Sequence, residues 1–190
     1  NTNPAYESNP KENDDARHER FSSLTDFPNF LLQVLRVHTQ SDVALDDKQL
    51  LTEFDKHLFN SKDNIENSLN KLKNFTYSLL KIKFLYDSYI IKRDFSKEME
   101  GWYLLSLKFS NDNSSYVNTF EQNERDNSRQ LILLLSAFHV SAPAKSYKYW
   151  LNGALKILVD SNENGLVGIK TYLDKLELLA FKTLRPGVKK

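Results

Sequence analysis

The chain has 190 residues, with 26 Lys and Arg against 25 Asp and Glu, which leaves a formal net charge of +1. This balance excludes a globally basic nucleic-acid binder, although local patches of either sign stay open. The chain contains no Cys, which excludes disulfides, a thiolate nucleophile, a zinc ribbon and an iron–sulfur cluster. The longest apolar run, Leu131 to Leu135, is far shorter than the ~20 residues of a membrane-spanning helix. Because no signal-peptide pattern follows Asn1 either, we expect a cytoplasmic protein.

The first residues predict a flexible segment. Residue 1 is Asn and the only methionine is Met99, so we expect the chain to be an excised piece of a longer protein. Residues 1–20 are rich in Asn and charged side chains and have few apolar ones. Such a composition cannot offset the entropy of ordering. It predicts a disordered linker or arm over residues 1–20 and a single helical domain over residues 21–190.

Two short helices are predicted next. Apolar residues at helical spacing begin at Phe27, with Asp26 as the expected N-cap and Pro28 in the first turn. The same spacing returns over Leu50–Leu58, after the acidic pair Asp46–Asp47. Carboxylates are favourable at a helix N-terminus, so capping accounts for this pair without a catalytic role.

The third helix is predicted to be the longest. It starts at a cap, Ser61 or Asp63, and continues to about Ile91 without Gly or Pro. Its length suggests the central helix of a bundle. The residues expected to form its apolar stripe are Ile65, Leu69, Leu72, Thr76, Leu79 and Phe84.

The second half of the chain is predicted to contain three more helices. Residues 94–115 lose the helical period, and Trp102 to Phe109 fits a short strand, an irregular packed loop or a helix. Residues 126–139 and 147–158 are expected to pair as a helical hairpin around Pro143. A last helix covers residues 169–180. The sequence thus predicts an all-α fold, an irregular bundle of about six helices with a flexible N-terminal arm.

Charge is more segregated than the total suggests. Residues 61–97 sum to +4 and residues 129–190 to +6, whereas the rest of the chain is acidic. If the third helix and the C-terminal hairpin lie side by side, their cations form one basic face, with aromatic residues between them. The alternative is that the aromatic residues belong to the core and the lysines are solvated. The residues predicted to contact a nucleic-acid backbone are Lys81, Lys83, Lys92, Arg93, Lys145 and Lys148.

Catalytic and cofactor motifs are not found in the sequence. The four histidines, His18, His38, His57 and His139, have no HxH, HExxH or HxxxH spacing, so they are expected to be surface or core-edge residues rather than metal ligands. The patterns GxxxxGK[ST], GxGxxG, GxSxG and SxxK do not occur either. We therefore predict no catalytic residues, no metal and no cofactor for this chain.

Several fragments, in order along the chain, resemble one family. They are Phe27-Pro-Asn-Phe-Leu-Leu-Gln-Val-Leu-Arg-Val37, Leu45-Asp-Asp-Lys-Gln-Leu-Leu51, Lys83-Phe-Leu-Tyr-Asp87, Tyr89-Ile-Ile-Lys-Arg93, Asn118-Thr-Phe120, Leu133-Leu-Leu-Ser-Ala-Phe-His-Val-Ser141 and Tyr149-Trp-Leu151. This ordered set resembles the helical region that follows the ParB/sulfiredoxin-like module of GmrSD-type restriction and phage-defence proteins. The Asp-Gly-Gln-Gln-Arg motif of that module does not occur in this sequence, and neither does an HNH nuclease motif. No catalytic residue carries over.

The resemblance implies a role within a larger, nucleotide-dependent endonuclease. We expect a non-catalytic domain that positions DNA or couples the modules of a modification-dependent restriction protein. The expected partners are the missing catalytic modules of the parent chain, with DNA and a second copy of the chain as further candidates and no membrane. The alternative is a structural protein-interaction or dimerisation bundle without DNA contact. A hydrolase whose site assembles from distant residues ranks third.

Overall fold

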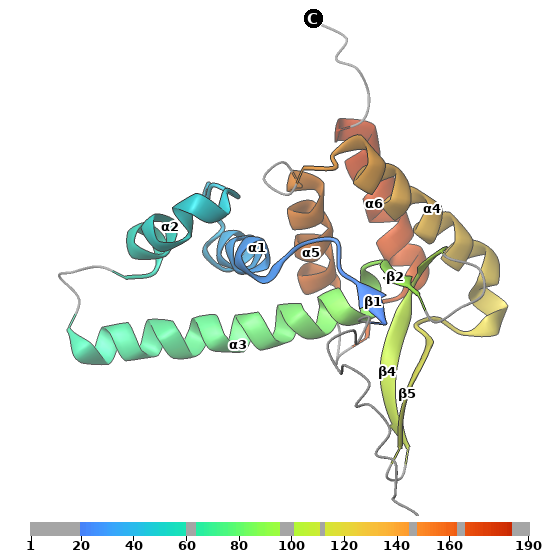
Figure 1. Cartoon of the computed structure of the whole chain (residues 1–190), viewed down its shortest axis with the longest axis horizontal. Helices are drawn as coiled ribbons and strands as arrows, with labels where there is room; N and C mark the ends of the chain where they lie inside the picture. Colours follow the sequence, from blue (N-terminus) through green and yellow to red (C-terminus); the bar gives the residue numbers. More distant parts are fainter. Residues whose placement is uncertain are drawn as a thin grey trace, which may run out of the picture.

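The structure is a computed structural model that describes residues 20–59, 64–95, 101–110, 113–144, 148–162 and 166–183. These residues form six α-helices and five short strands (Figure 1). The helices are α1 (Phe27–Thr39), α2 (Leu50–His57), α3 (Ile65–Tyr89), α4 (Arg125–Ser141), α5 (Tyr149–Ser161) and α6 (Ile169–Thr183). The strands are β1 (Phe21–Ser22), β2 (Lys92–Asp94), β3 (Gly101–Tyr103), β4 (Leu105–Ser110) and β5 (Asn113–Asn118), and 3₁₀ turns lie at Asp47–Gln49 and Gln122–Glu124.

The two N-terminal helices form as predicted. Helix α1 is capped by Asp26, whose carboxylate accepts a hydrogen bond from the Asn29 amide at 3.1 Å, and Pro28 lies in the first turn. Helix α2 follows a 3₁₀ turn in which the Asp46 carboxylate accepts a hydrogen bond from the Lys48 amide. The capping interpretation of this acidic residue is confirmed. Residues 1–19, which hold most of the predicted arm, lie outside the described residues.

Helix α3 has the predicted length but buries a different face. Its N-cap is Asn64, whereas the predicted caps Ser61 and Asp63 lie outside the described residues. The buried side of α3 carries Phe75, Ile82, Leu85, Tyr86 and Tyr89. Most of the predicted stripe is exposed instead: Ile65, Leu69, Leu72 and Phe84. The stripe prediction is wrong because α3 carries two apolar faces, and only one of them meets the rest of the molecule.

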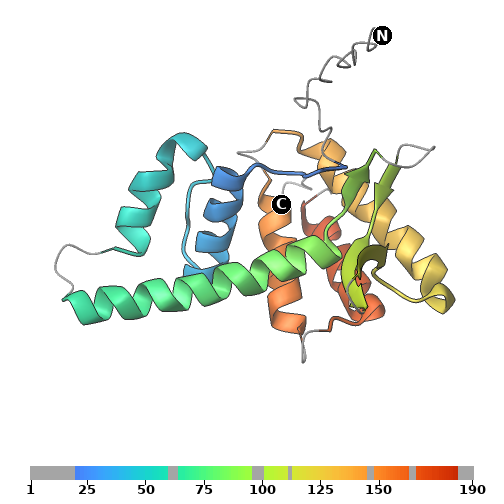
Figure 2. The same cartoon turned by 60° about the horizontal axis from the view of Figure 1, so that its bottom comes forward.

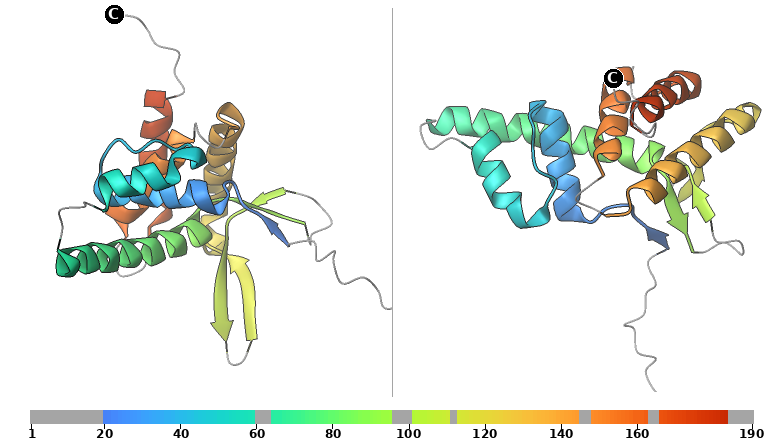
Figure 3. Two further views of the ribbon diagram at one scale, coloured as in Figure 1. Left: turned by 60° about the vertical axis from the view of Figure 1, so that its left-hand side comes forward. Right: turned by 90° about the horizontal axis from the view of Figure 1, so that it is seen from above.

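Strands make the fold mainly helical rather than all-α. The segment left open by the sequence forms β3 and the hairpin β4–β5, in which Leu105 pairs with Asn118 and Ser110 with Asn113. A second, three-stranded antiparallel sheet has the order β1-β2-β3, with Phe21 opposite Asp94. Figure 3 shows the hairpin standing away from the helices. The all-α prediction fails at β1 because its partner β2 lies far away in sequence. It fails at the other strands because short apolar runs do not distinguish a strand from a helix by periodicity.

The C-terminal helices form a cluster of three. Helix α6 packs against both α4 and α5. The prediction that residues 126–139 and 147–158 pair as a helical hairpin is wrong, because α4 and α5 pack mainly on α6 and meet each other at the Phe138–Trp150 stack. Gly153 on α5 permits the close approach of α5 and α6, since a Cβ there would lie 2.9 Å from Leu179 Cδ2 on α6.

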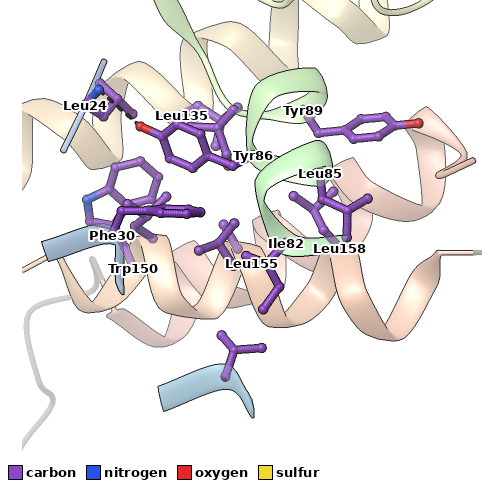
Figure 4. Packing of buried hydrophobic residues seen from close by; sticks show 14 of the residues in the cluster. Leu24, Phe30, Ile82, Leu85, Tyr86, Tyr89, Leu135, Trp150, Leu155 and Leu158 are labelled. Atoms are coloured by element: carbon purple, nitrogen blue, oxygen red, sulfur yellow. Dashed lines mark hydrogen bonds between the residues drawn. The ribbon is translucent and has the colours of Figure 1, made fainter. Parts of the chain in front are cut away.

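Helix α5, rather than α3, occupies the centre of the core. It packs against α1, α3 and α6, and its residues Leu151, Ala154, Leu155 and Leu158 are fully buried. Figure 4 shows Leu155 and Leu158 facing Ile82 and Leu85 of α3, with Phe30, Tyr86 and Trp150 closing one end of the cluster. The N-terminal half of α3 extends past this core (Figure 2). No helix in the described ranges is long and apolar enough to cross a membrane.

Candidate functional site

The predicted basic face is best judged from its most buried member, Lys148. Its side chain is 1% exposed. The ammonium donates hydrogen bonds to the carbonyls of Ala142 (3.2 Å) and Pro143 (3.1 Å), just past the end of α4, and lies 3.3 Å from His139 Nδ1. A cation is favourable beside the carbonyls that end a helix. Lys148 therefore holds α4 to the start of α5, and the expectation that it belongs to an exposed basic face is corrected.

Lys92 also has a structural environment. Its ammonium donates to the carbonyl of Asp87 at the end of α3 and to the carbonyl of Leu105 at the start of the hairpin, the latter at 2.9 Å. It lies 5.6 Å from the ring centroid of Phe21 and 5.4 Å from that of Tyr116, within cation–π range. Burial lowers the pKa of Lys92, and the nearby Asp87 carboxylate opposes this effect. Lys92 thus joins α3, β1 and the hairpin.

The remaining predicted cations have separate partners where the structure describes them. Lys83 is exposed on α3 and forms an ion pair with Asp87 one turn later. The Arg93 guanidinium lies over the ring of Phe95, 5.2 Å from its centroid. Lys81 is half-buried on α3, and Lys145 lies outside the described residues. Helices α3 and α5 do lie side by side. Among the cations that the structure describes, Lys83 and Lys92 line the same cavity, whereas Lys148 is buried at the end of α4.

A cavity of about 260 Å³ lies where the C-terminal end of α3 meets β1 and the hairpin. Lys83 and Asp87 line one side, and Tyr116 of the hairpin lines another. The Phe21 and Tyr116 rings meet edge to face at 4.5 Å. Arg20, the last residue of the predicted arm, covers both rings and forms an ion pair with the buried Asp94 at 3.1 Å. These contacts fix the hairpin on α3 and place its apolar side beside that helix.

Tyr86 anchors the chain before α1 to the same end of α3. Its buried hydroxyl accepts a hydrogen bond from the Leu24 amide at 3.2 Å (Figure 4) and shares another with Ser23 Oγ at 2.8 Å. Burial raises its pKa. Tyr86, Tyr89 and Trp150 are all buried, so for these residues the core interpretation is confirmed over base stacking.

Replacing Tyr86 by phenylalanine should lower the free energy of unfolding by about 1.5 kcal/mol, because the buried Leu24 amide loses its acceptor. Urea unfolding followed by circular dichroism measures this change. Tyr77→Phe on the exposed side of the same helix is the matched control and should be neutral. Equal effects of the two substitutions would contradict the anchoring role.

Two histidines lie at the edge of the core. His38 Nδ1 lies 2.8 Å from Ser78 Oγ, and burial lowers the pKa of His38. Burial, and then the charge of Lys148, lower the pKa of His139, whose ring also meets Trp102 edge to face. The described residues include no group of three or more His, Asp or Glu side chains that could hold a metal ion.

These shifts predict how stability depends on pH. A histidine with a lowered pKa in the folded state binds its proton more readily when unfolded, so its contribution to stability is lost as the pH falls below about 6.5. His139→Gln keeps an acceptor for Lys148 but cannot titrate. The loss of unfolding free energy between neutral pH and about pH 5.5 should therefore be smaller in this variant than in the unsubstituted chain. Urea titrations at both pH values measure it, and an unchanged difference would contradict the assignment.

One side of α3 carries an exposed apolar surface. Helix α3 exposes Ile65, Leu69, Leu72, Tyr77, Leu80 and Phe84 along one side, called here the outer face of α3. On the hairpin, Leu107 and Phe109 are also exposed. Sequence reasoning found part of this set but assigned it to the core. The available signal was that α3 has apolar residues on two sides, which exceeds what one core contact needs.

Comparisons of the chain with protein-family models, curated proteins and solved structures find no match. Nothing in them links the chain to GmrSD-type proteins or to ParB-like modules. The predicted resemblance therefore rests on the ordered sequence fragments alone.

Proposed function

We propose that this chain is a non-catalytic protein-interaction domain that uses the outer face of α3 to dock another protein surface. The observation that carries the proposal is that six large apolar side chains lie uncovered along one side of a well-formed helix. Monomeric proteins rarely leave a contiguous apolar patch of this size uncovered unless it binds something. The interaction alternative predicted from sequence is thus favoured over DNA positioning.

The surroundings of the cations predicted to contact DNA also favour an interaction domain over DNA positioning. Two of the six residues predicted to contact DNA, Lys92 and Lys148, donate to backbone carbonyls inside the fold. A third, Lys83, is paired with Asp87. Phosphate contacts require cations that can reach the nucleic-acid backbone and displace its counterions. Lys148 is buried and cannot do so, and Lys92 is half-buried with its ammonium engaged by two carbonyls.

The proposal places the domain in a larger cytoplasmic protein. In a GmrSD-like parent, an interaction domain of this kind would couple the nucleotide-hydrolysing and nuclease modules, or hold two copies of the parent together. Both roles need a docking face and neither needs a catalytic residue in this chain.

Two measurements test the proposed function. At concentrations low enough to keep the chain monomeric, it should bind the apolar dye ANS, and the double variant Leu80→Gln, Phe84→Gln should bind less dye at an unchanged melting temperature. Duplex DNA, with plain or modified cytosine, should show no affinity that falls steeply with salt. Unchanged dye binding in the double variant would overturn the proposal. Salt-dependent DNA binding that Lys81→Glu weakens, and the control Lys56→Glu on α2 does not, would favour DNA positioning instead.

A further inference from the structure

The outer face of α3 is made of two neighbouring rows of side chains. Residues four apart on a helix form ridges, and two such ridges lie side by side here. The first is Ile65, Leu69, Lys73 and Tyr77, and the second is Leu72, Thr76, Leu80 and Phe84. The six apolar members are between 44% and 89% exposed. Helices α1 and α2 lie on the other side of α3, as Figures 1 and 2 show.

The two ridges are related to each other by reversal of the chain direction. Counted from the midpoint between Asn74 and Phe75, Ile65 lies as far in one direction as Phe84 does in the other. The same holds for the pairs Leu69 and Leu80, Leu72 and Tyr77, and Lys73 and Thr76. A two-fold axis through this midpoint therefore places the first ridge of one copy against the second ridge of another. This is the self-complementarity that a symmetric, isologous dimer requires.

Charge disfavours a parallel arrangement of the two α3 helices. A parallel arrangement in register would set Lys73 of one copy against Lys73 of the other. Like charges facing each other across an interface oppose association. In the antiparallel pair, the stem of Lys73 lies along the helix while its ammonium reaches water.

The area of the face is adequate for a dimer. With about 200 Å² for a fully exposed large apolar side chain, the six residues present about 700 Å² at their observed exposures. A stable interface buries about 800 Å² on each partner. The hairpin supplies the difference. Leu107 of the hairpin lines the same cavity as Lys83 and Asp87 of α3, so the apolar side of the hairpin lies at the end of the outer face. Phe109 at its far end is 80% exposed.

We propose that a second copy of this chain is the occupant of this face, with the two α3 helices antiparallel about an axis between Asn74 and Phe75. The inference rests on the proposed function, since it names the partner of the docking face. Leu80 meets Leu69 of the partner subunit at two symmetric places. The hairpin of each copy lies beside the start of the other copy's α3.

Sedimentation equilibrium over a concentration series tests the dimer. The unsubstituted 190-residue chain should show a reversible monomer–dimer equilibrium. Leu80→Glu should raise the dissociation constant about 100-fold, because a charge is buried at two equivalent places and each costs at least tenfold. Leu133→Glu on α4 is the matched control, since Leu133 is 61% exposed against 66% for Leu80, and it should leave the equilibrium unchanged.

Cysteine crosslinking tests the orientation, since the chain has no cysteine of its own. A mixture of Ile65→Cys and Phe84→Cys chains should form a disulfide-linked heterodimer under mild oxidation, whereas Ile65→Cys alone should not crosslink. Crosslinking of Ile65→Cys with itself would overturn the antiparallel arrangement. A chain that stays monomeric at all concentrations but binds ANS through the outer face would overturn the dimer and leave the proposed function standing. A monomer whose ANS binding is unchanged by substitutions in the outer face would overturn both the dimer and the proposed function.

Discussion

Replacing Phe138 by alanine should lower the free energy of unfolding by about 4 kcal/mol, the cost of removing a large buried ring. Phe138 is fully buried on α4, and its ring stacks on Trp150 of α5 with centroids 5.4 Å apart and planes 8° from parallel. The lost atoms leave a cavity between two helices that are also held by α6. Because both helices are fixed elsewhere, the cavity cannot collapse fully, and the loss exceeds the transfer free energy of the ring alone.

Urea unfolding at neutral pH measures the effect of Phe138→Ala. Leu133→Ala is the control on the same helix, where the side chain faces solvent, and it should change stability by less than about 0.5 kcal/mol. Phe138→Leu, which refills most of the space, should recover more than half of the loss. A loss below about 1.5 kcal/mol for Phe138→Ala would mean that α4 and α5 repack around the gap.

The helices could be predicted because their signals are local. Asp26 and Pro28 mark the start of α1 within three residues of each other, and the apolar period of α5 alone identifies Leu151, Leu155 and Leu158 as core residues. Each signal depends on the residue types within one or two turns. Six helices follow from such signals, and the structure contains six in the described ranges.

The buried face of α3 could not be predicted in the same way. Periodicity locates an apolar face but does not say what covers it. On α3, both the side with Phe75 and Leu85 and the side with Leu69 and Leu80 follow helical spacing. The choice between them depends on where α1 and α5 lie, which is a property of the whole fold. The same limit hid the strands, since β1 meets β2 only after α3 has reversed the direction of the chain.

The structural roles of Lys92 and Lys148 could not be predicted from the sequence for a related reason. Lysine is mostly an exposed residue, so a sequence reader assigns Lys92 and Lys148 to the surface. Their burial depends on carbonyl groups left without partners where α3 and α4 end. Which lysine lies near such an end is decided by the path of the chain, and no residue type signals it. The exposed Lys83, the half-buried Lys92 and the buried Lys148 therefore look alike in sequence.

Replacing Lys148 by methionine should lower the free energy of unfolding by about 3 kcal/mol. The methionine retains the length of the side chain and removes the ammonium, so the carbonyls of Ala142 and Pro143 lose their donor inside the fold. Each unpaired buried carbonyl costs about 1–3 kcal/mol, and relief of the buried charge offsets part of the sum. Lys156→Met on α5 is the matched control: Lys156 is exposed and forms an ion pair with the exposed Asp160, so its loss should cost less than about 0.5 kcal/mol.

A second readout separates this structural role of Lys148 from a role in binding. Because the charge of Lys148 lowers the pKa of His139, Lys148→Met should raise that pKa toward the ordinary value, which an NMR titration of the His139 ring records. Lys156→Met should leave it unchanged. A lysine whose purpose is to hold a nucleic-acid backbone would behave differently: its replacement would weaken duplex binding while the stability and the His139 titration stayed the same. That result would return Lys148 to a basic face and favour DNA positioning over the interaction domain proposed for this chain.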